Sequence, residues 1–103
     1  MKKYNKLVRD KIPEIIKKRG QQPITRILDD REYIEQLFEK LCEEIDEFDE
    51  DRNAAELADV LEVLTALAQA LDISQKDLKL SRVKKARAHG VFKKRLFLER
   101  VEE

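Results

Sequence analysis

At 103 residues the chain has the size of one small domain, and a single core of that size buries only about 60 to 70% of the surface that the unfolded chain exposes. Charged residues make up 43% of the sequence, whereas glycine and proline occur only twice each, which favours an all-α protein over a turn-rich β fold. The formal net charge is zero, so we expect no nucleic-acid polymer as a general partner.

The first two helices are predicted from capping and stop signals. A helix is expected from about Asp10 to Lys18, because Asp10 can cap it, Pro13 is tolerated in a first turn and Gly20 offers a stop. Residues 20–28 are then expected to form a loop or an extended arm. The next helix begins near Asp29, where Asp29-x-x-Glu32 is a capping-box pattern. Its apolar stripe is expected to face the core: Ile34, Leu37, Phe38, Leu41, Ile45 and Phe48.

The second half of the chain predicts two further helices and a tail. One runs from Asn53 to about Leu71 and is apolar on two sides, so it lies centrally or at a subunit interface. Ser74-x-x-Asp77 caps the last helix, which stops near Gly90. The tail 91–101 fits a short helix, a strand-like arm or a segment packed on a partner subunit.

No linker or repeat divides the sequence, so residues 1–103 are expected to form one compact helical bundle of about four helices. Small size and the two-sided helix predict that oligomerisation completes it, as a homodimer or homotetramer. The single Cys42 excludes an intramolecular disulfide, and no apolar run or signal-type leader is present. We therefore expect a cytoplasmic protein with no membrane partner.

Two carboxylate pairs, Glu44-x-x-Glu47 and Glu56-x-x-Asp59, flank the predicted connection between the second and third helices. Each pair is spaced i,i+3 and so shares a helix face, and an antiparallel hairpin would bring the pairs side by side. Four carboxylates repel one another unless divalent cations lie between them, and such oxygen ligands suit Mg²⁺ or Mn²⁺.

Structural explanations compete with this interpretation. Asn53-x-x-Glu56 is also a capping box, so Glu56 can be only a helix cap. Glu44 and Glu47 lie in an acidic run whose members are mostly solvated. Asp59 is harder to explain structurally, because Asp is a poor mid-helix residue and its neighbours are apolar.

Three segments together resemble the MazG-like, phosphoribosyl-ATP pyrophosphohydrolase-like family of all-α nucleoside triphosphate pyrophosphohydrolases. The first is residues 6–16, KLVRDKIPEII. The second is residues 40–48, KLCEEIDEF, followed by residues 56–61, ELADVL, which match an ExxE and ExxD metal motif. The third is residues 85–98, in which His89 and Val91 depart from the family pattern.

The resemblance implies Mg²⁺ held by Glu44, Glu47, Glu56 and Asp59, and attack of a metal-bound water on the α-phosphorus with one of these carboxylates as base. The resemblance also implies that the products are a nucleoside monophosphate and pyrophosphate, and that the substrate is a standard or modified nucleoside triphosphate, as in house-cleaning enzymes. Independently of the family, a triphosphate needs cations. The candidates are Arg9, Lys11, Lys85 and Lys93.

Two alternatives remain open from the sequence. The same motif supports a phosphoribosyl-ATP pyrophosphohydrolase of histidine biosynthesis. From a different class, the chain fits a non-catalytic helical dimerisation or nucleotide-sensing module, in which the carboxylates only cap and solubilise.

Overall fold

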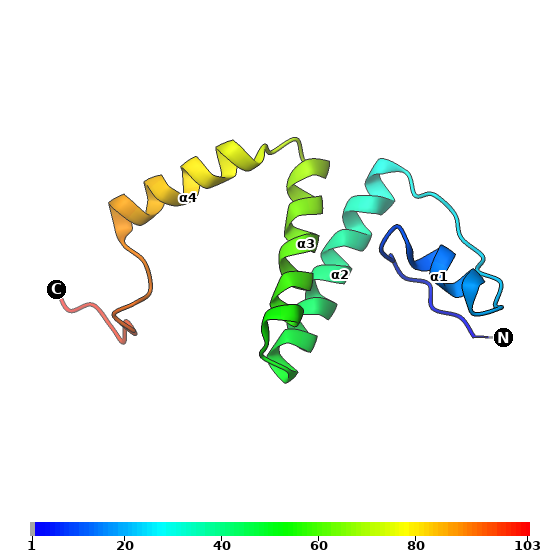
Figure 1. The fold of residues 1–103 in the computed structure, drawn as a ribbon. Helices are drawn as coiled ribbons and strands as arrows, with labels where there is room; N and C mark the ends of the chain where they lie inside the picture. Colours follow the sequence, from blue (N-terminus) through cyan, green and yellow to red (C-terminus); the bar gives the residue numbers. More distant parts are fainter. Residues whose placement is uncertain (1) are drawn as a thin grey trace. The chain divides into compact units, whose positions relative to one another are not determined.

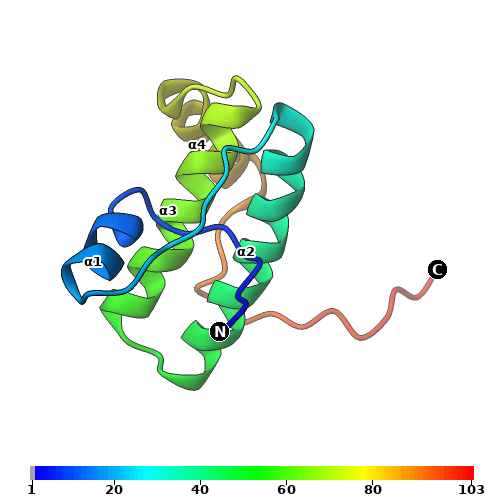
Figure 2. The same cartoon turned by 90° about the vertical axis from the view of Figure 1, so that its right-hand side faces the viewer.

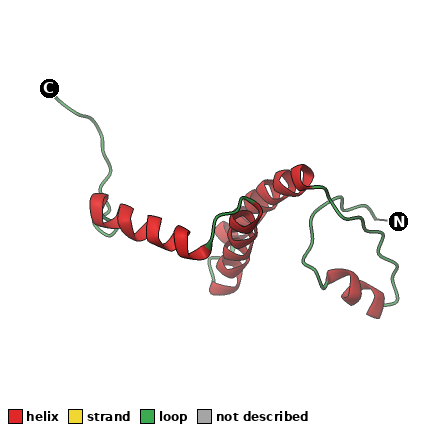
Figure 3. Ribbon diagram, turned by 90° about the horizontal axis from the view of Figure 1, so that it is seen from above, coloured by secondary structure: helices red, strands yellow, loops and turns green. Residues whose placement is uncertain are grey.

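The computed structural model describes residues 2–103, and within this range it contains four α-helices and no strand (Figures 1 and 3). The predicted all-α class is therefore confirmed, with the predicted number of helices. The contacts divide the chain into two units, one up to Asp72 and one from Ile73 to Glu103, and each is described by itself. The helices are α1 Ile12–Lys18, α2 Asp30–Glu50, α3 Ala54–Ala70 and α4 Gln75–His89.

Three of the four helices begin at the capping residues that the sequence indicates. The side chains of Asp29, Asn53 and Ser74 each accept a hydrogen bond from the backbone N–H three residues later, at 2.9, 2.9 and 3.0 Å. These bonds satisfy N–H groups that have no partner within the helix. Gly90 ends α4 with a positive φ of 85°, which glycine adopts without strain.

The predicted capping residue of α1 is wrong by one position. Lys11, not Asp10, occupies the N-cap position, and no side chain caps this helix. The Ile12 N–H donates to Arg9 O at 3.1 Å, so Asp10 lies inside a tight turn that precedes the helix. Pro13 stands in the first turn, where its missing N–H costs nothing.

Helices α2 and α3 lie side by side as an antiparallel hairpin joined by residues 51–53 (Figure 1). Leu37 from α2 and Val63 and Leu67 from α3 form the buried centre of the core. The partly buried residues packed against it are Leu7, Tyr33, Leu41, Ala66 and Ala70. The buried residues of α3 are Val60, Val63, Leu67 and Ala68, and Ala66 and Ala70 are partly buried beside them.

The expectation that the whole apolar stripe of α2 faces the core is wrong. Phe38 and Ile45 are 52% and 47% exposed, whereas Leu37 is buried. Phe38 follows Leu37 directly, so it is rotated by about 100° around the helix and points away from the residues that pack against Leu37.

The chain before α1 crosses the α2–α3 hairpin (Figure 2). Leu7 packs against the core, Lys6 Nζ lies 3.6 Å from Glu43 Oε1, and Arg9 reaches Asp59. The residues between α1 and α2 then return along the hairpin, where Arg26 pairs with Glu32 in the first turn of α2 at 2.8 Å. The N-terminal segment is therefore held by one apolar and two ionic contacts.

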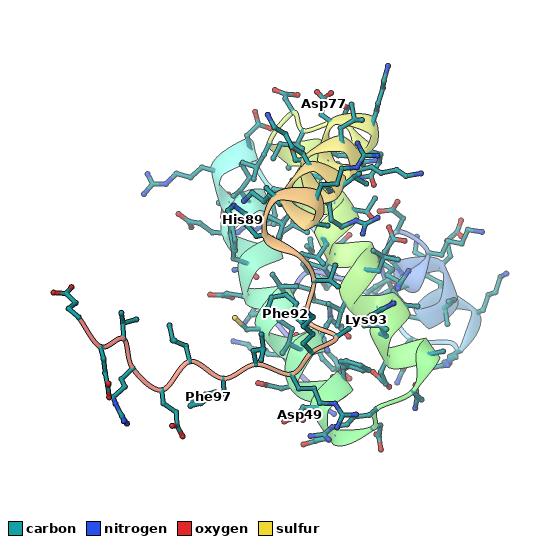
Figure 4. The ribbon with its side chains drawn as sticks, turned by 90° about the vertical axis from the view of Figure 1, so that its left-hand side faces the viewer. Asp49, Asp77, His89, Phe92, Lys93 and Phe97 are labelled. Carbon is teal, nitrogen blue, oxygen red and sulfur yellow. The ribbon has the colours of Figure 1, made fainter. Side chains whose placement is uncertain are left out.

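The second unit contains α4 and the tail, and it has no buried residue. After Gly90 the tail makes one turn, in which the Arg95 N–H donates to Phe92 O at 3.3 Å, and then runs on without helix or strand. Phe92 and Lys93 lie at the turn and Phe97 on the extended part (Figure 4). None of the described helices is both long and apolar enough to cross a bilayer.

Candidate metal centre

Three of the four predicted carboxylates converge on one point of the hairpin. Glu44 from α2 and Glu56 and Asp59 from α3 each contribute an oxygen, and these three oxygens lie within 4.8 Å of one another. We call these three residues the carboxylate cluster. The hairpin produces this convergence because Glu44 lies late in α2, whereas Glu56 and Asp59 lie in the first turns of α3.

The capping explanation for Glu56 accounts for its backbone but not for its side chain. Its N–H donates to the Asn53 side chain, as in a capping box. The reciprocal bond of that motif would engage the N–H of Asn53, and this N–H donates to Asp51 O instead. The carboxylate of Glu56 is therefore available to the carboxylate cluster.

Burial distinguishes Glu44 from the other acidic side chains of α2. Glu44 is only 7% exposed and is the one buried charged residue among residues 2–103. In that range Oε2 of Glu44 and Oε2 of Glu56 are buried oxygens with no hydrogen-bond partner. An unpartnered buried carboxylate oxygen costs several kcal/mol, on the order of 2–7 for a neutral polar group and more for a charge. A divalent cation bound by oxygen ligands would remove that cost.

Glu47, the fourth predicted ligand, is exposed but electrostatically linked to the cluster. The negative charge of Glu44 raises the pKa of Glu47, and desolvation and the charges of Glu43 and Glu56 add to the rise. The C-terminal end of α2 adds to the negative charge around Glu47, because the last turn has no basic residue to offset the negative end of the helix dipole. The region thus carries more negative charge than its surroundings neutralise.

Two cations already contact the carboxylate cluster. Arg9 Nη2 donates to Asp59 Oδ1 at 2.7 Å, and both side chains are partly exposed. Lys40 Nζ lies 3.4 Å from Glu44 Oε1 and 3.5 Å from Glu43 Oε1, and its side chain is 18% exposed. The sequence reasoning named Arg9 but missed Lys40, although its i,i+4 spacing to Glu44 was visible.

The other three predicted cations, Lys11, Lys85 and Lys93, have no described contact with the carboxylate cluster. Lys11 is exposed at the start of α1, two residues from Arg9. Lys85 on α4 and Lys93 in the tail are exposed and belong to the second unit, and Figure 4 labels Lys93. Of the four predicted substrate-binding residues, Arg9 is the one with a described contact to the carboxylate cluster.

Fold and cluster together define an all-α chain with an acidic group that is suited to a metal ion. No family model, curated protein or solved structure matches the chain. The MazG-like resemblance therefore rests on the sequence segments given above, and the metal's identity rests on the chemistry of the ligands.

Proposed function

We propose that the protein is a Mg²⁺-dependent nucleotide pyrophosphohydrolase, which cleaves a nucleoside triphosphate into a monophosphate and pyrophosphate. The observation that carries the proposal is the pair of buried, unpartnered oxygens on Glu44 and Glu56, within one cluster that also contains Asp59. The paired i,i+3 carboxylates and the matching N-terminal and C-terminal segments support it further.

The residues present fit a hard divalent cation. All three members of the carboxylate cluster offer oxygen ligands, and Glu47 lies close enough for its pKa to respond to them. No histidine or thiolate takes part, which favours Mg²⁺ or Mn²⁺ over softer metals. When bound, such an ion binds phosphate oxygens and lowers the pKa of a coordinated water.

The chain's own residues supply positioning and charge. Arg9 stands next to the cluster on an exposed side chain, where a guanidinium can bind two phosphate oxygens at once. Lys40 holds Glu44 in place from the same helix and offsets part of its charge. Glu47 is the candidate general base, because its raised pKa moves it towards the range in which a carboxylate accepts protons efficiently.

Metal binding is tested first, because it does not require the substrate. Titration of Mg²⁺ or Mn²⁺ should raise the melting temperature by mass action, and calorimetry should give a saturable site. Glu44→Gln and Glu56→Gln should weaken binding by more than the roughly 10- to 100-fold that the loss of an outer-shell partner costs. Matched controls are Glu39→Gln on α2 and Glu62→Gln on α3, which remove the same charge from exposed positions. Equal loss in ligand and control variants would contradict a specific site.

Turnover is tested with standard and modified nucleoside triphosphates and with phosphoribosyl-ATP. Pyrophosphate release that needs Mg²⁺ and is lost in Asp59→Asn supports the proposal, and the preferred substrate separates the house-cleaning activity from histidine biosynthesis. Saturable binding of metal and nucleotide without hydrolysis of any of them would favour the nucleotide-sensing module instead. No metal-dependent stabilisation and no turnover would overturn the enzymatic function.

A further inference from the structure

Residues 6–9 form a short segment, neither helix nor strand, that crosses the α2–α3 hairpin, and we call it the strap (Figure 2). Each end of the strap is marked by a bend. It follows Asn5, which has a positive φ of 46°, and it ends in the turn that the Ile12 N–H closes on Arg9 O. The strap is therefore an element of its own and not an extension of α1.

Side chains alone hold the strap on the hairpin. Lys6 Nζ lies 3.6 Å from Glu43 Oε1 on α2, and Leu7 packs against the core. The Arg9 guanidinium donates to Asp59 Oδ1 on α3 at 2.7 Å. Within residues 2–103, no backbone hydrogen bond joins the strap to either helix. Whether the strap stays in place thus depends on three side-chain contacts.

The Arg9 contact is the stronger of the two ionic ones. It is short and joins two charged groups, and such hydrogen bonds are about twice as strong as neutral ones. The Lys6 contact is longer, and Lys40 shares the same Glu43 oxygen at 3.5 Å. Apart from the partly buried Leu7, the strap is exposed. Without the Arg9 contact, one long ion pair and one apolar side chain would remain.

Arg9 holds a carboxylate that also belongs to the carboxylate cluster. The oxygens of the cluster lie within 4.8 Å of one another, so a cation between them would lie close to the guanidinium on Asp59. At about 5 Å, repulsion between a divalent cation and a guanidinium amounts to roughly tenfold in an equilibrium constant, even in bulk water. A partly exposed ion pair contributes up to about fivefold. Because the repulsion is larger, a cation in the cluster disfavours the contact of Arg9 with Asp59.

The two protein cations beside the cluster differ in how easily they leave it. Lys40 lies on α2 itself, four residues before Glu44, and its side chain is only 18% exposed. The Arg9 side chain is 57% exposed and extends from the strap. Arg9 is therefore the cation that is free to move away.

We propose that the strap responds to metal: it lies on the hairpin while the carboxylate cluster holds no ion, and it loosens when an ion is bound, because Asp59 then releases Arg9. The freed guanidinium binds phosphate oxygens of the nucleotide. Without metal, Asp59 keeps Arg9 away from the phosphates, so the metal ion has to arrive before the nucleotide or together with it. The inference rests on the metal site of the proposed function.

The test is NMR relaxation of the backbone amide groups of the full chain, first without ligand, then with Mg²⁺, then with Mg²⁺ and a non-hydrolysable nucleoside triphosphate. Amide shifts of Glu44, Glu56 and Asp59 report whether Mg²⁺ occupies the cluster. As Mg²⁺ saturates the cluster, the order parameters of the strap should fall from about 0.85, typical of rigid backbone, towards the roughly 0.6 of flexible backbone. The nucleotide should raise them again, because Arg9 then holds a phosphate. Residues 24–27 are the internal control and should not respond.

Variants of Arg9 separate the strap from the metal site. In Arg9→Gln the strap should be flexible without metal, and Mg²⁺ should still shift the cluster but loosen the strap no further. Arg9→Lys keeps the charge and should restore part of the wild-type response. Arg26→Gln is the matched control, since it removes a pair of similar exposure that does not involve the cluster. It should behave like the wild type.

The outcomes distinguish the strap from the proposed metal site. If Mg²⁺ shifts the cluster while the strap stays rigid, the inference is wrong and the metal site stands. A strap that stays rigid in Arg9→Gln without metal also contradicts it. If Mg²⁺ shifts nothing at the cluster, the metal site fails and the inference fails with it. A strap that loosens with Mg²⁺ but stays flexible with bound nucleotide rules out the phosphate contact of Arg9.

Discussion

Arg9 and Asp59 are 50 residues apart in the sequence, and the Arg9 guanidinium donates a 2.7 Å hydrogen bond to Asp59 Oδ1. The contact links the segment before α1 to the carboxylate cluster on the hairpin. In the chain without metal, Arg9 therefore neutralises one of the side chains that we propose as a metal ligand. A cation on Asp59 and a cation from the N-terminal segment compete for the same carboxylate.

This competition predicts opposite effects of Arg9→Ala on two ligands. Metal binding should become tighter, by roughly two- to fivefold, because a partly exposed ion pair is worth up to ~1 kcal/mol. Nucleotide binding in the presence of metal should become weaker, because a phosphate ligand is lost. Calorimetry with Mn²⁺ alone and then with a non-hydrolysable nucleotide measures both.

Arg26→Ala is the control for Arg9→Ala, because it removes another arginine–carboxylate pair of similar exposure that does not involve the carboxylate cluster. It should change neither affinity. If Arg9→Ala weakened metal binding while the chain stayed folded, Arg9 would act as a structural support for Asp59 and not as a competitor.

The raised pKa of Glu47 predicts how stability depends on pH in the absence of metal. A carboxyl whose pKa is raised in the folded state favours folding below its ordinary pKa, near 4.5, and this contribution disappears as the pH rises through the raised value. The melting temperature should therefore fall as the pH is raised from mildly acidic to neutral. In Glu47→Gln that fall should be smaller, whereas Glu39→Gln should behave like the wild type.

Magnesium supplies the second part of the Glu47 experiment. At neutral pH, where the carboxylates repel most, added Mg²⁺ should raise the wild-type melting temperature more than at acidic pH. A wild-type curve that rises with pH, or that Mg²⁺ leaves unchanged at neutral pH, would mean that repulsion around Glu44 does not limit stability.

The features that the sequence predicted correctly, the starts of α2, α3 and α4, depend on local interactions. Asp29, Asn53 and Ser74 cap helices because a side-chain oxygen and an N–H three residues later meet within one turn, whatever the rest of the chain does. The convergence of the carboxylate cluster needed one further step, the short antiparallel connection at residues 51–53, which the capping signals also indicated.

What the sequence could not supply depends on tertiary packing. Helix α3 is apolar on two sides, and periodicity alone does not say that Val63 faces the core while Leu64 stays exposed. Periodicity also does not predict the path of the N-terminal segment over the hairpin, because Leu7 and Arg9 contact residues far along the chain. The i,i+4 spacing of Lys40 and Glu44 is visible in the sequence, but the sequence does not show that Glu44 is buried, which is what makes the contact important.

The Asn53 cap predicts a link between helix initiation and the metal site. Asn53→Ala should cost about 1 kcal/mol of stability, because the Glu56 N–H loses its partner. It should also weaken metal binding, since the first turn of α3 carries Glu56 and Asp59. Ser74→Ala removes an equivalent cap from α4 and is the matched control, which should leave metal affinity unchanged. Calorimetric titration of both variants with Mn²⁺ checks this, and equal metal affinity in the two would show that the cluster does not need an ordered α3 start.

The small core predicts that a single truncation at its centre threatens the whole fold of the first unit. Leu67 is 6% exposed and packs with Leu37 and Val63, so Leu67→Ala should cost roughly 2–5 kcal/mol, a large part of the total stability of a small domain. Ile27→Ala removes the same kind of side chain from a position that is 99% exposed, and it should leave the melting temperature nearly unchanged. Because the metal is expected to bind only the folded hairpin, saturating Mg²⁺ should restore part of the helix content that Leu67→Ala loses, as followed by circular dichroism. The control is a double variant that carries both Leu67→Ala and Glu44→Gln. If Mg²⁺ stabilised this double variant as much as it stabilises Leu67→Ala alone, the cation would act by general screening and not through the carboxylate cluster.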